Sequence, residues 1–207
     1  MVGIIDYGVG NLFSLCSSLR FVGAEAVVSG DREILKSADR LLLPGVGAFG
    51  DAAEKLRMSG MAEFIKAEAR TGKPILGVCL GMQLLFEKSY EYGEHEGLGL
   101  LKGDVVGMKG RLPEALKIPH MGWNGLHIER KHTLLKYVRE GDCVYFVHSF
   151  YAENCEESLI ASTEYGKFIA AAVAEGNIMG CQFHPEKSGS VGLSVLRSFC
   201  ETEVGQL

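Results

Sequence analysis

The feature that most limits the possible folds is a series of short, continuous apolar runs in the first half of the chain. They read VGIID at 2–6, EAVVS at 25–29, RLLLPG at 40–45 and PILGV at 74–78. Amphipathic patterns with helical spacing separate the runs, among them NLFSLCSSLRFVG, DAAEKLR and MAEFIKAEAR, and a further helical pattern, LGMQLLFEK at 80–88, follows the last run. Strands that are apolar along their whole length are typical of a parallel sheet with helices on both faces. The first half of the chain therefore predicts an α/β fold.

The second half changes to strand candidates at close spacing, with few helical patterns between them. These candidates are 97–101, 104–108, 125–129, 143–149, 158–163, 168–174 and 178–184. Several should pair antiparallel and either extend the sheet or form a small side sheet. A helical pattern at 189–204 follows them. We see no linker or internal repeat within residues 1–207, so we expect a single domain.

Composition and charge argue against several classes of protein. The formal net charge is −5 and no basic stripe is present, so we expect no nucleic-acid partner. Because no apolar run reaches the ~20 residues of a membrane span and no signal-like pattern is present, we expect no membrane partner. The six cysteines include no C-x-x-C pair, which indicates reduced thiols in a cytoplasmic protein.

The stretch GVCLG, from Gly77 to Gly81, has the form of a nucleophile elbow with cysteine in place of the serine of G-x-S-x-G. Glycines on both sides permit a sharp turn from a strand into a helix. Cys79 would stand at the helix N-terminus, where free amides stabilise negative charge on sulfur. The Leu80 amide could stabilise an oxyanion at the same place. The motif alone leaves open a buried cysteine that only ends a core strand.

One histidine is placed to act as a base for this cysteine. His184 follows an apolar run and precedes Pro185, and proline keeps the residue before it extended. Strand alternation would then bring the Glu186 carboxylate to the same side as the imidazole. A carboxylate can hold one ring nitrogen while the other ring nitrogen faces a thiol. The sequence therefore predicts the base and orienting half of a catalytic triad.

Other patterns suggest different chemistry and are weaker. GVGAFG at 45–50 matches the dinucleotide pattern G-x-G-x-x-G, but the next strand ends without the acidic residue that holds a ribose. Cys181 and His184 have C-x-x-H spacing, but residues three apart on a strand point to opposite faces, and a second ligand pair is missing. We therefore expect neither a cofactor nor a metal. His95 and His132 have the sequence surroundings of surface residues.

GVCLGMQ, QFHPE and LPGVGAFG occur together in an order that resembles the class I glutamine amidotransferases. The resemblance covers nearly the whole chain. It implies a flavodoxin-like α/β fold, a three-layer sandwich with a central mostly parallel or mixed sheet and a small antiparallel side sheet. It also implies a Cys79–His184–Glu186 triad that hydrolyses the carboxamide of glutamine through a thioester. The residues it implies for the oxyanion hole and the glutamine site are Gly45, Gly47, Leu80, Gln83, His148, Ser149 and Phe150.

The flanking segments DYGVGN, IPHMGWN, YFVHSF and FHPEKSG narrow the resemblance to glutaminase subunits of histidine biosynthesis. This implies a heterodimer with a separate (β/α)8-barrel cyclase that receives the ammonia, with Trp123 and Lys187 at the interface. Packing in the core is the alternative for Trp123. Phe150 stands where the family often has tyrosine, which removes a hydroxyl but leaves a main-chain contact. We also hypothesise that the 45–47 loop points a carbonyl at the oxyanion site until the cyclase docks.

Other functions remain open at this point. A glutaminase subunit of another class I pathway, a stand-alone γ-glutamyl hydrolase and a cysteine-based redox protein would all use an elbow thiol. A redox protein would not need the H-P-E sequence, and a γ-glutamyl hydrolase should act alone. A catalytically inactive binding subunit would not need all three triad residues.

Overall fold

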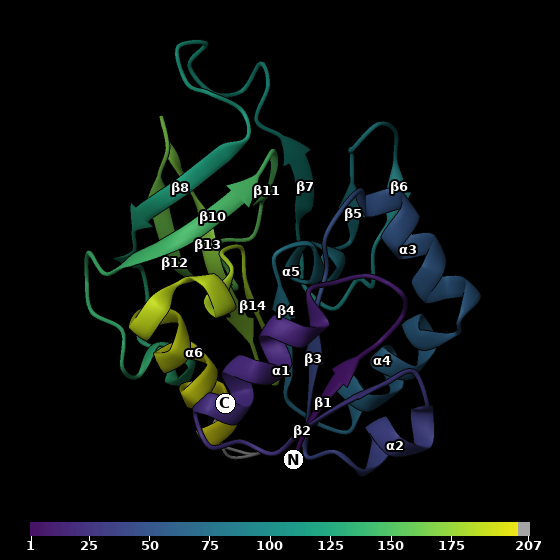
Figure 1. The fold of residues 1–207 in the computed structure, drawn as a ribbon. Coiled ribbons are helices and arrows are strands. Elements are labelled where there is room, and N and C mark those ends of the chain that lie inside the picture. Colours follow the sequence, from purple (N-terminus) through teal and green to yellow (C-terminus); the bar gives the residue numbers. More distant parts are fainter. Residues whose placement is uncertain (203–207) are drawn as a thin grey trace.

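The computed structural model describes residues 1–202 and is built around one large mixed sheet (Figure 1). Its strands are Val2–Ile5 (β1), Ala26–Ser29 (β2), Arg40–Leu43 (β3), Ile75–Val78 (β4), His127–Ile128 (β9), Leu159–Glu164 (β12), Phe168–Glu175 (β13) and Ile178–Cys181 (β14). They follow the order β2-β1-β3-β4-β14-β13-β12-β9. The pairs from β2 to β14 are parallel and those from β14 to β9 are antiparallel. The parallel sheet predicted from the first half is therefore confirmed; the second half adds one parallel strand, β14, and then three antiparallel strands.

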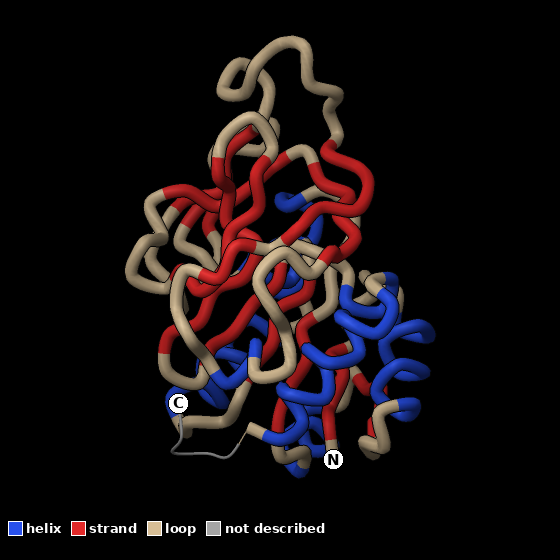
Figure 2. The backbone as a smooth tube through the Cα atoms, turned by 90° about the vertical axis from the view of Figure 1, so that its left-hand side faces the viewer, coloured by secondary structure: helices blue, strands red, loops and turns tan. Residues whose placement is uncertain are grey.

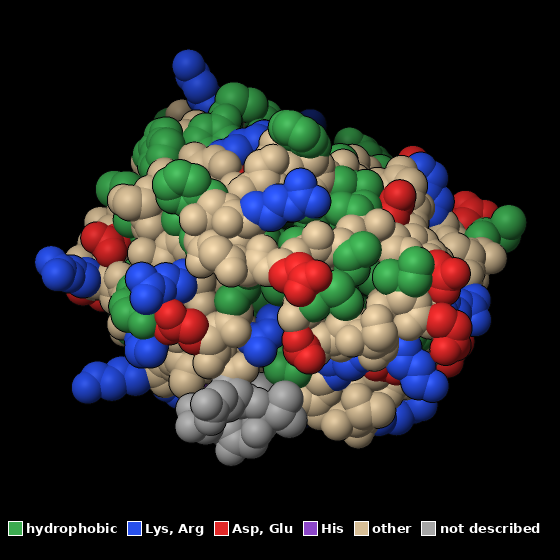
Figure 3. Space-filling view, turned by 60° about the horizontal axis from the view of Figure 1, so that its bottom comes forward, with side chains coloured by type: hydrophobic (Ala, Val, Ile, Leu, Met, Phe, Trp, Pro, Cys, Tyr) green, Lys and Arg blue, Asp and Glu red, His purple; other side chains and the backbone are tan. Residues whose placement is uncertain are grey.

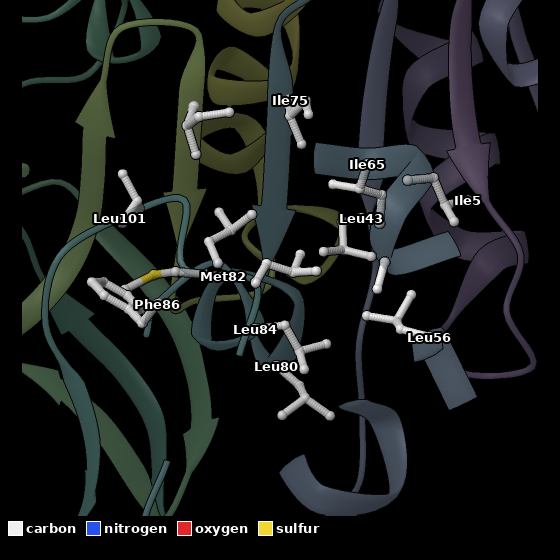
Figure 4. Close-up of a cluster of buried hydrophobic side chains, with 14 of the residues drawn as sticks. Ile5, Leu43, Leu56, Ile65, Ile75, Leu80, Met82, Leu84, Phe86 and Leu101 are labelled. Carbon is white, nitrogen blue, oxygen red and sulfur yellow. The ribbon is translucent and has the colours of Figure 1, made fainter. Parts of the chain in front are cut away.

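Helices cover both faces of the sheet, and each face has its own hydrophobic cluster. One face carries α1 (Leu12–Phe21) and α6 (Gly189–Glu201). The other face carries α2 (Arg32–Ser37), α3 (Phe49–Met58), α4 (Met61–Arg70) and α5 (Leu80–Leu84). Figure 4 shows the cluster on the second face, in which Leu43 and Ile75 of the sheet lie among Leu56, Ile65 and Leu80 of the helices. The structure thus has the predicted layer of helices on each side of the sheet.

Two smaller sheets pack against the large one. A four-stranded sheet has the order β11 (Phe150–Glu153), β7 (Asp104–Gly107), β5 (Lys88–Ser89) and β6 (His95–Glu96), and β10 (Cys143–His148) pairs with β8 (His120–Gly125). In Figure 2 these strands occupy the upper part of the molecule, and a long loop between β7 and β8 stands above them. The predicted antiparallel side sheet corresponds to β8 and β10, whereas β5 and β7 run parallel.

Two sequence predictions near α5 are wrong, and one loop explains both. The pattern at 97–101 predicts a strand and the pattern at 80–88 a helix, but the helix ends at Leu84 and residues 97–101 form a loop. The amides of Leu98 and Leu100 donate to carbonyls at the end of α5, at 2.8 Å each. Because this loop satisfies the carbonyls that a helix end leaves free, the helix can stop early and the loop needs no strand partner.

One further helix is not predicted by the sequence pattern, and two predicted elements end early. The unpredicted helix is α2, although Asp31 caps it by accepting hydrogen bonds from the amides of Glu33 and Ile34. The strand expected at 178–184 ends at Cys181, before the histidine of interest. The helix expected at 189–204 ends at Glu201, and residues 203–204 lie outside the described part of the chain.

The surface and helix lengths complete the description of the fold. Within residues 1–202, none of the helices has both the length and the apolar character needed to cross a membrane. Figure 3 shows the face at the bottom of Figure 1, where Lys and Arg side chains lie among those of Asp and Glu. This face therefore has mixed charge.

Candidate active site

Cys79 sits in a strained turn between β4 and α5. Its backbone has φ 55° and ψ −111°, a region that residues with a side chain rarely adopt. The Cys79 amide donates to the Cys181 carbonyl at 2.8 Å, which anchors the turn to the neighbouring strand β14. A methyl group on Gly77 would lie 2.6 Å from the carbonyl oxygen of Gly81, so the turn needs glycine at this position. The sharp turn predicted from GVCLG is therefore present, and the fold holds it under strain.

The loop that follows β3 packs directly against this turn. A methyl group on Gly45 would lie 2.5 Å from the amide nitrogen of Gly81, so the two backbones touch only because both residues lack a side chain. Gly47 has φ 91°, and the Tyr7 hydroxyl donates to the Pro44 carbonyl at 2.8 Å. The structure thus brings the main chain of the 45–47 loop next to the turn that carries the cysteine.

The expected contact between His184 and Glu186 is present, but strand alternation does not produce it. Residues Pro185–Lys187 form a short 3₁₀-helix (η2), and His184 precedes it in an extended conformation. His184 Nδ1 lies 2.9 Å from Glu186 Oε1, and the two side chains are 5% and 1% exposed. Water therefore screens this pair very little, and the carboxylate fixes the orientation of the ring.

The surroundings of His184 favour its protonated form. Burial alone lowers the pKa of His184, but hydrogen bonds with Cys79 and Glu186 and the negative charges of these groups outweigh it and raise the pKa from 6.5 to about 9. The imidazole is therefore protonated at neutral pH. An imidazolium next to the Cys79 sulfur stabilises negative charge on that sulfur.

Cys79 and His184 both line a cavity of about 390 Å³, within the size range of small-molecule sites. Gly45 lies buried beneath this cavity and Glu186 lies behind His184, so neither appears in its wall. The other predicted site residues all line it. The lining residues are Val46, Gly47, Cys79, Leu80, Gln83, Glu91, Tyr92, Pro119, Val147, His148, Ser149, Phe150, His184 and Lys187.

The main-chain carbonyl of Phe150 is a hydrogen-bonding centre in one wall of the cavity. It accepts from Gln83 Nε2 at 3.0 Å and from His148 Nδ1 at 2.8 Å. His148 is nearly fully buried; burial, aided by repulsion from His120 and His184, outweighs the bond to Phe150 and lowers its pKa to about 3. His148 is therefore neutral with its proton on Nδ1. As expected for phenylalanine at position 150, the contact here is made by the main chain.

The chain matches a known protein family along nearly its whole length. A sequence profile described as "Glutamine amidotransferase class-I" matches residues 3–202. The chain belongs to the class I glutamine amidotransferases. The resemblance stated from the three motifs is thereby confirmed.

Individual relatives of this amidotransferase agree with the family assignment. A protein of Caldanaerobacter subterraneus subsp. tengcongensis named "Imidazole glycerol phosphate synthase subunit HisH" is 52% identical over 202 residues, which cover 97% of this chain and 98% of the relative. A protein of Wolinella succinogenes with the same name is 51% identical over 203 residues, covering 97% and 99%. A solved structure described as a glutamine amidotransferase matches with a TM-score of 0.75 at 20% identity over 97% of each chain. PurLQS from Thermotoga maritima matches with a TM-score of 0.74 at 22% identity over 96% of each chain. The two structures show the fold alone.

Glu91 and Tyr92 of this amidotransferase line the cavity but are not among the site residues predicted from the sequence. The stretch around them is acidic, and a solvated loop explains such a stretch. Instead, Glu91 is 9% exposed, and its Oε2 accepts from the Phe49 amide at the start of α3 at 2.6 Å. Burial raises the pKa of the Glu91 carboxyl, although the Phe49 amide opposes this. The contact joins residues 42 positions apart in sequence, and no local pattern predicts it.

The exposure of the side chains of Trp123, Lys187 and His132 bears on three further predictions from the sequence. Trp123 is 55% exposed and stands edge-on to Tyr145, with ring centres 6.0 Å apart, so the interpretation of Trp123 as a core residue is wrong. Lys187 is exposed at the cavity rim, as a residue of a docking surface should be. His132 is half-buried and caps a short 3₁₀-helix (η1, Thr133–Leu135), so its interpretation as a surface residue is also wrong.

Proposed function

We propose that this amidotransferase is the glutaminase subunit of imidazole glycerol phosphate synthase, with residues 1–207 as a single glutaminase domain. Relatives of that name, 52% and 51% identical along nearly the whole chain, support the assignment. The observation that carries the chemistry is His184, which contacts Glu186 and lines the same cavity as Cys79, in surroundings that raise the His184 pKa to about 9. All six cysteines are free, which supports a location in the reducing cytoplasm.

In the first half-reaction, the Cys79 thiolate attacks the side-chain carbonyl carbon of glutamine. A C–S bond forms, and the electron pair of the carbonyl π bond moves to oxygen. The Leu80 amide and an amide of the 45–47 loop stabilise this oxyanion. His184 then gives its proton to the nitrogen, the C–N bond breaks and ammonia leaves, which produces a γ-glutamyl thioester.

In the second half-reaction, water attacks the thioester while neutral His184 takes its proton. The tetrahedral intermediate collapses and the C–S bond breaks. Glutamate leaves and gives its carboxyl proton to the solvent. Cys79 departs as a thiolate beside a protonated His184, so the pair ends in the state in which it began. Glu186 orients the imidazole through both steps and favours its cationic form.

We assign the amino-acid end of glutamine to the wall formed by Gln83, Glu91 and the 148–150 segment. The Glu91 carboxylate has the charge to pair with an α-ammonium group. Both hydrogens of Gln83 Nε2 are donated within the protein, at 2.9 and 3.0 Å, so the oxygen of this amide is the group left for a substrate donor. His148 and Ser149 line the same wall.

We assign the acceptor of the ammonia to a separate (β/α)8-barrel cyclase. Ammonia in water at neutral pH is mostly protonated and no longer nucleophilic, so delivery needs a dry passage between docked subunits. Val46, Met121 and Trp123 are 44%, 61% and 55% exposed. Exposed apolar side chains of this kind suit a stable protein interface. We further propose that docking turns a main-chain amide of the 45–47 loop toward the oxyanion. Without the partner a carbonyl points there instead, which keeps the lone subunit inactive.

The test is a glutaminase assay with the chain alone, with the cyclase subunit, and with the cyclase plus its nucleotide substrate. Glutamate release should depend on the partner, Cys79→Ala should abolish it, and the exposed Cys143→Ala variant should leave it unchanged. Equal release with and without the partner would instead favour a stand-alone γ-glutamyl hydrolase. No release under any condition would overturn the proposal.

A further inference from the structure

One buried polar side chain outside the predicted triad and glutamine site reaches the nucleophile. Gln182 is 0% exposed, and its Nε2 lies 3.8 Å from Cys79 Sγ. Its position follows from the sheet, because Gln182 comes directly after β14, the strand whose last carbonyl accepts from the Cys79 amide. The main-chain amide of Gln182 donates to the Ala171 carbonyl of β13 at 2.8 Å. The main chain of Gln182 is therefore fixed by the sheet at the point from which its side chain reaches the sulfur.

The direction of the contact between Gln182 and the sulfur follows from the bonds around it. The Phe150 carbonyl can only accept, so the group that Gln83 presents to it at 3.0 Å must be its NH₂. The same NH₂ donates to Gln182 Oε1 at 2.9 Å. With its oxygen engaged there, Gln182 must present its own NH₂ to Cys79. A main-chain carbonyl thus orients a chain of two amides, and the chain ends with an N–H donor at the sulfur.

We propose that Gln182 stabilises the thiolate of Cys79 by donating a hydrogen bond to it, and that the Gln83–Gln182 pair holds this donor in place. The inference deepens the proposed function, since it concerns the same nucleophile. A thiol can act as a weak donor or a weak acceptor, whereas a thiolate can only accept. An N–H donor that cannot turn away therefore favours the thiolate. The donor adds to the stabilising effect of the His184 imidazolium on the same sulfur.

The same donor serves the reaction at the step where the thioester breaks. Sulfur then regains its negative charge at a buried residue, and a donor that is already in position needs no reorganisation at that moment. Without a partner for its NH₂, a buried glutamine would be a costly residue here. Gln182 is thus expected to act on the thiolate before acylation and again as the leaving group forms.

The test measures the pH dependence of Cys79 alkylation by iodoacetamide, followed on the Cys79 peptide by mass spectrometry. The variant Gln182→Met fills the same space without an N–H donor. It should raise the alkylation midpoint by about one to two pH units, which is roughly a 10- to 100-fold lower rate below the midpoint. With the partner subunit, glutaminase kcat should fall more than KM rises. The control Thr163→Val removes a different hydrogen bond of a buried side chain, at 2.8 Å to the Gly125 carbonyl, and should leave the midpoint unchanged.

A folded Gln182→Met variant with the midpoint of the wild type would overturn the inference and leave Gln182 as a core residue. Should that variant not fold, NMR on the wild-type chain decides the question. The side-chain amide protons of Gln182 should shift with the alkylation midpoint and lose this transition in Cys79→Ala. An unchanged signal across that pH range would also overturn the inference. Because alkylation does not require glutamine hydrolysis, these results are independent of the proposed function.

Discussion

Replacing Cys79 by glycine should leave the protein more stable than replacing it by alanine. Both variants lack the sulfur, so their difference isolates the backbone conformation of φ 55° and ψ −111°. Relief of that strain favours glycine by about 1–3 kcal/mol. The greater freedom of glycine in the unfolded chain opposes it by roughly 0.5–1 kcal/mol. The net preference for glycine is therefore about 1 kcal/mol, or ~2–4 °C in Tm for a chain of this size.

Thermal and urea unfolding of the two variants measure this preference. Cys181 provides the matched control, because it is also a buried cysteine but lies in the regular strand β14. There glycine should be less stable than alanine by about 0.5–1 kcal/mol, so the sign of the difference should reverse between the two positions. If Cys79→Ala were as stable as Cys79→Gly, or more so, the inference that the backbone of Cys79 is strained would be refuted.

Three further predictions concern charge, packing and docking. Because the pKa of His184 is raised from 6.5 to about 9, its contribution to stability should be complete below pH 6.5 and lost as the pH rises through 9. The Tm gap between wild type and His184→Gln should narrow over that range; a constant gap would contradict this. Gly81→Ala would push a methyl group into the carbonyl at the end of β3. The substitution should lower the free energy of unfolding, measured in urea, by about 1–3 kcal/mol. It should also lower the partner-dependent glutaminase activity ~10²-fold, because it displaces the 45–47 loop. Trp123→Ala should weaken the binding of the cyclase, measured by titration, by about 2 kcal/mol. Phe21 is exposed near Met1 and Glu201, and Phe21→Ala should leave this binding unchanged.

The sequence predicts those parts of the site that depend on neighbouring residues. The turn at Cys79 follows from the glycines around it, and the contact between His184 and Glu186 is formed within one short segment. The structural basis of this contact nevertheless differs from the prediction, because a 3₁₀ turn and not strand alternation brings the two side chains together. The layers of the fold were predictable for the same reason, since apolar strands and amphipathic helices carry local periodicity.

The remaining features depend on contacts between distant parts of the chain, which no local pattern encodes. Glu91 lies in an acidic stretch, but it turns inward because the first amide of α3 needs an acceptor. Helix α5 stops early because the loop at 97–101 bonds to its last carbonyls. Gln182 appears in the sequence only as part of the QFHPE motif, and its contact with the sulfur requires the register of β14 with β4.

The close approach of Gly45 and Gly81 has a consequence for redesigning the enzyme. With only hydrogen atoms between the two main chains, neither side of that seam can take on even one extra carbon without moving the other. Attempts to admit bulkier amide substrates therefore have to enlarge another part of the cavity wall, such as that formed by Tyr92, His148 and Phe150. The contact between Gly45 and Gly81 leaves no room for a substitution at either residue.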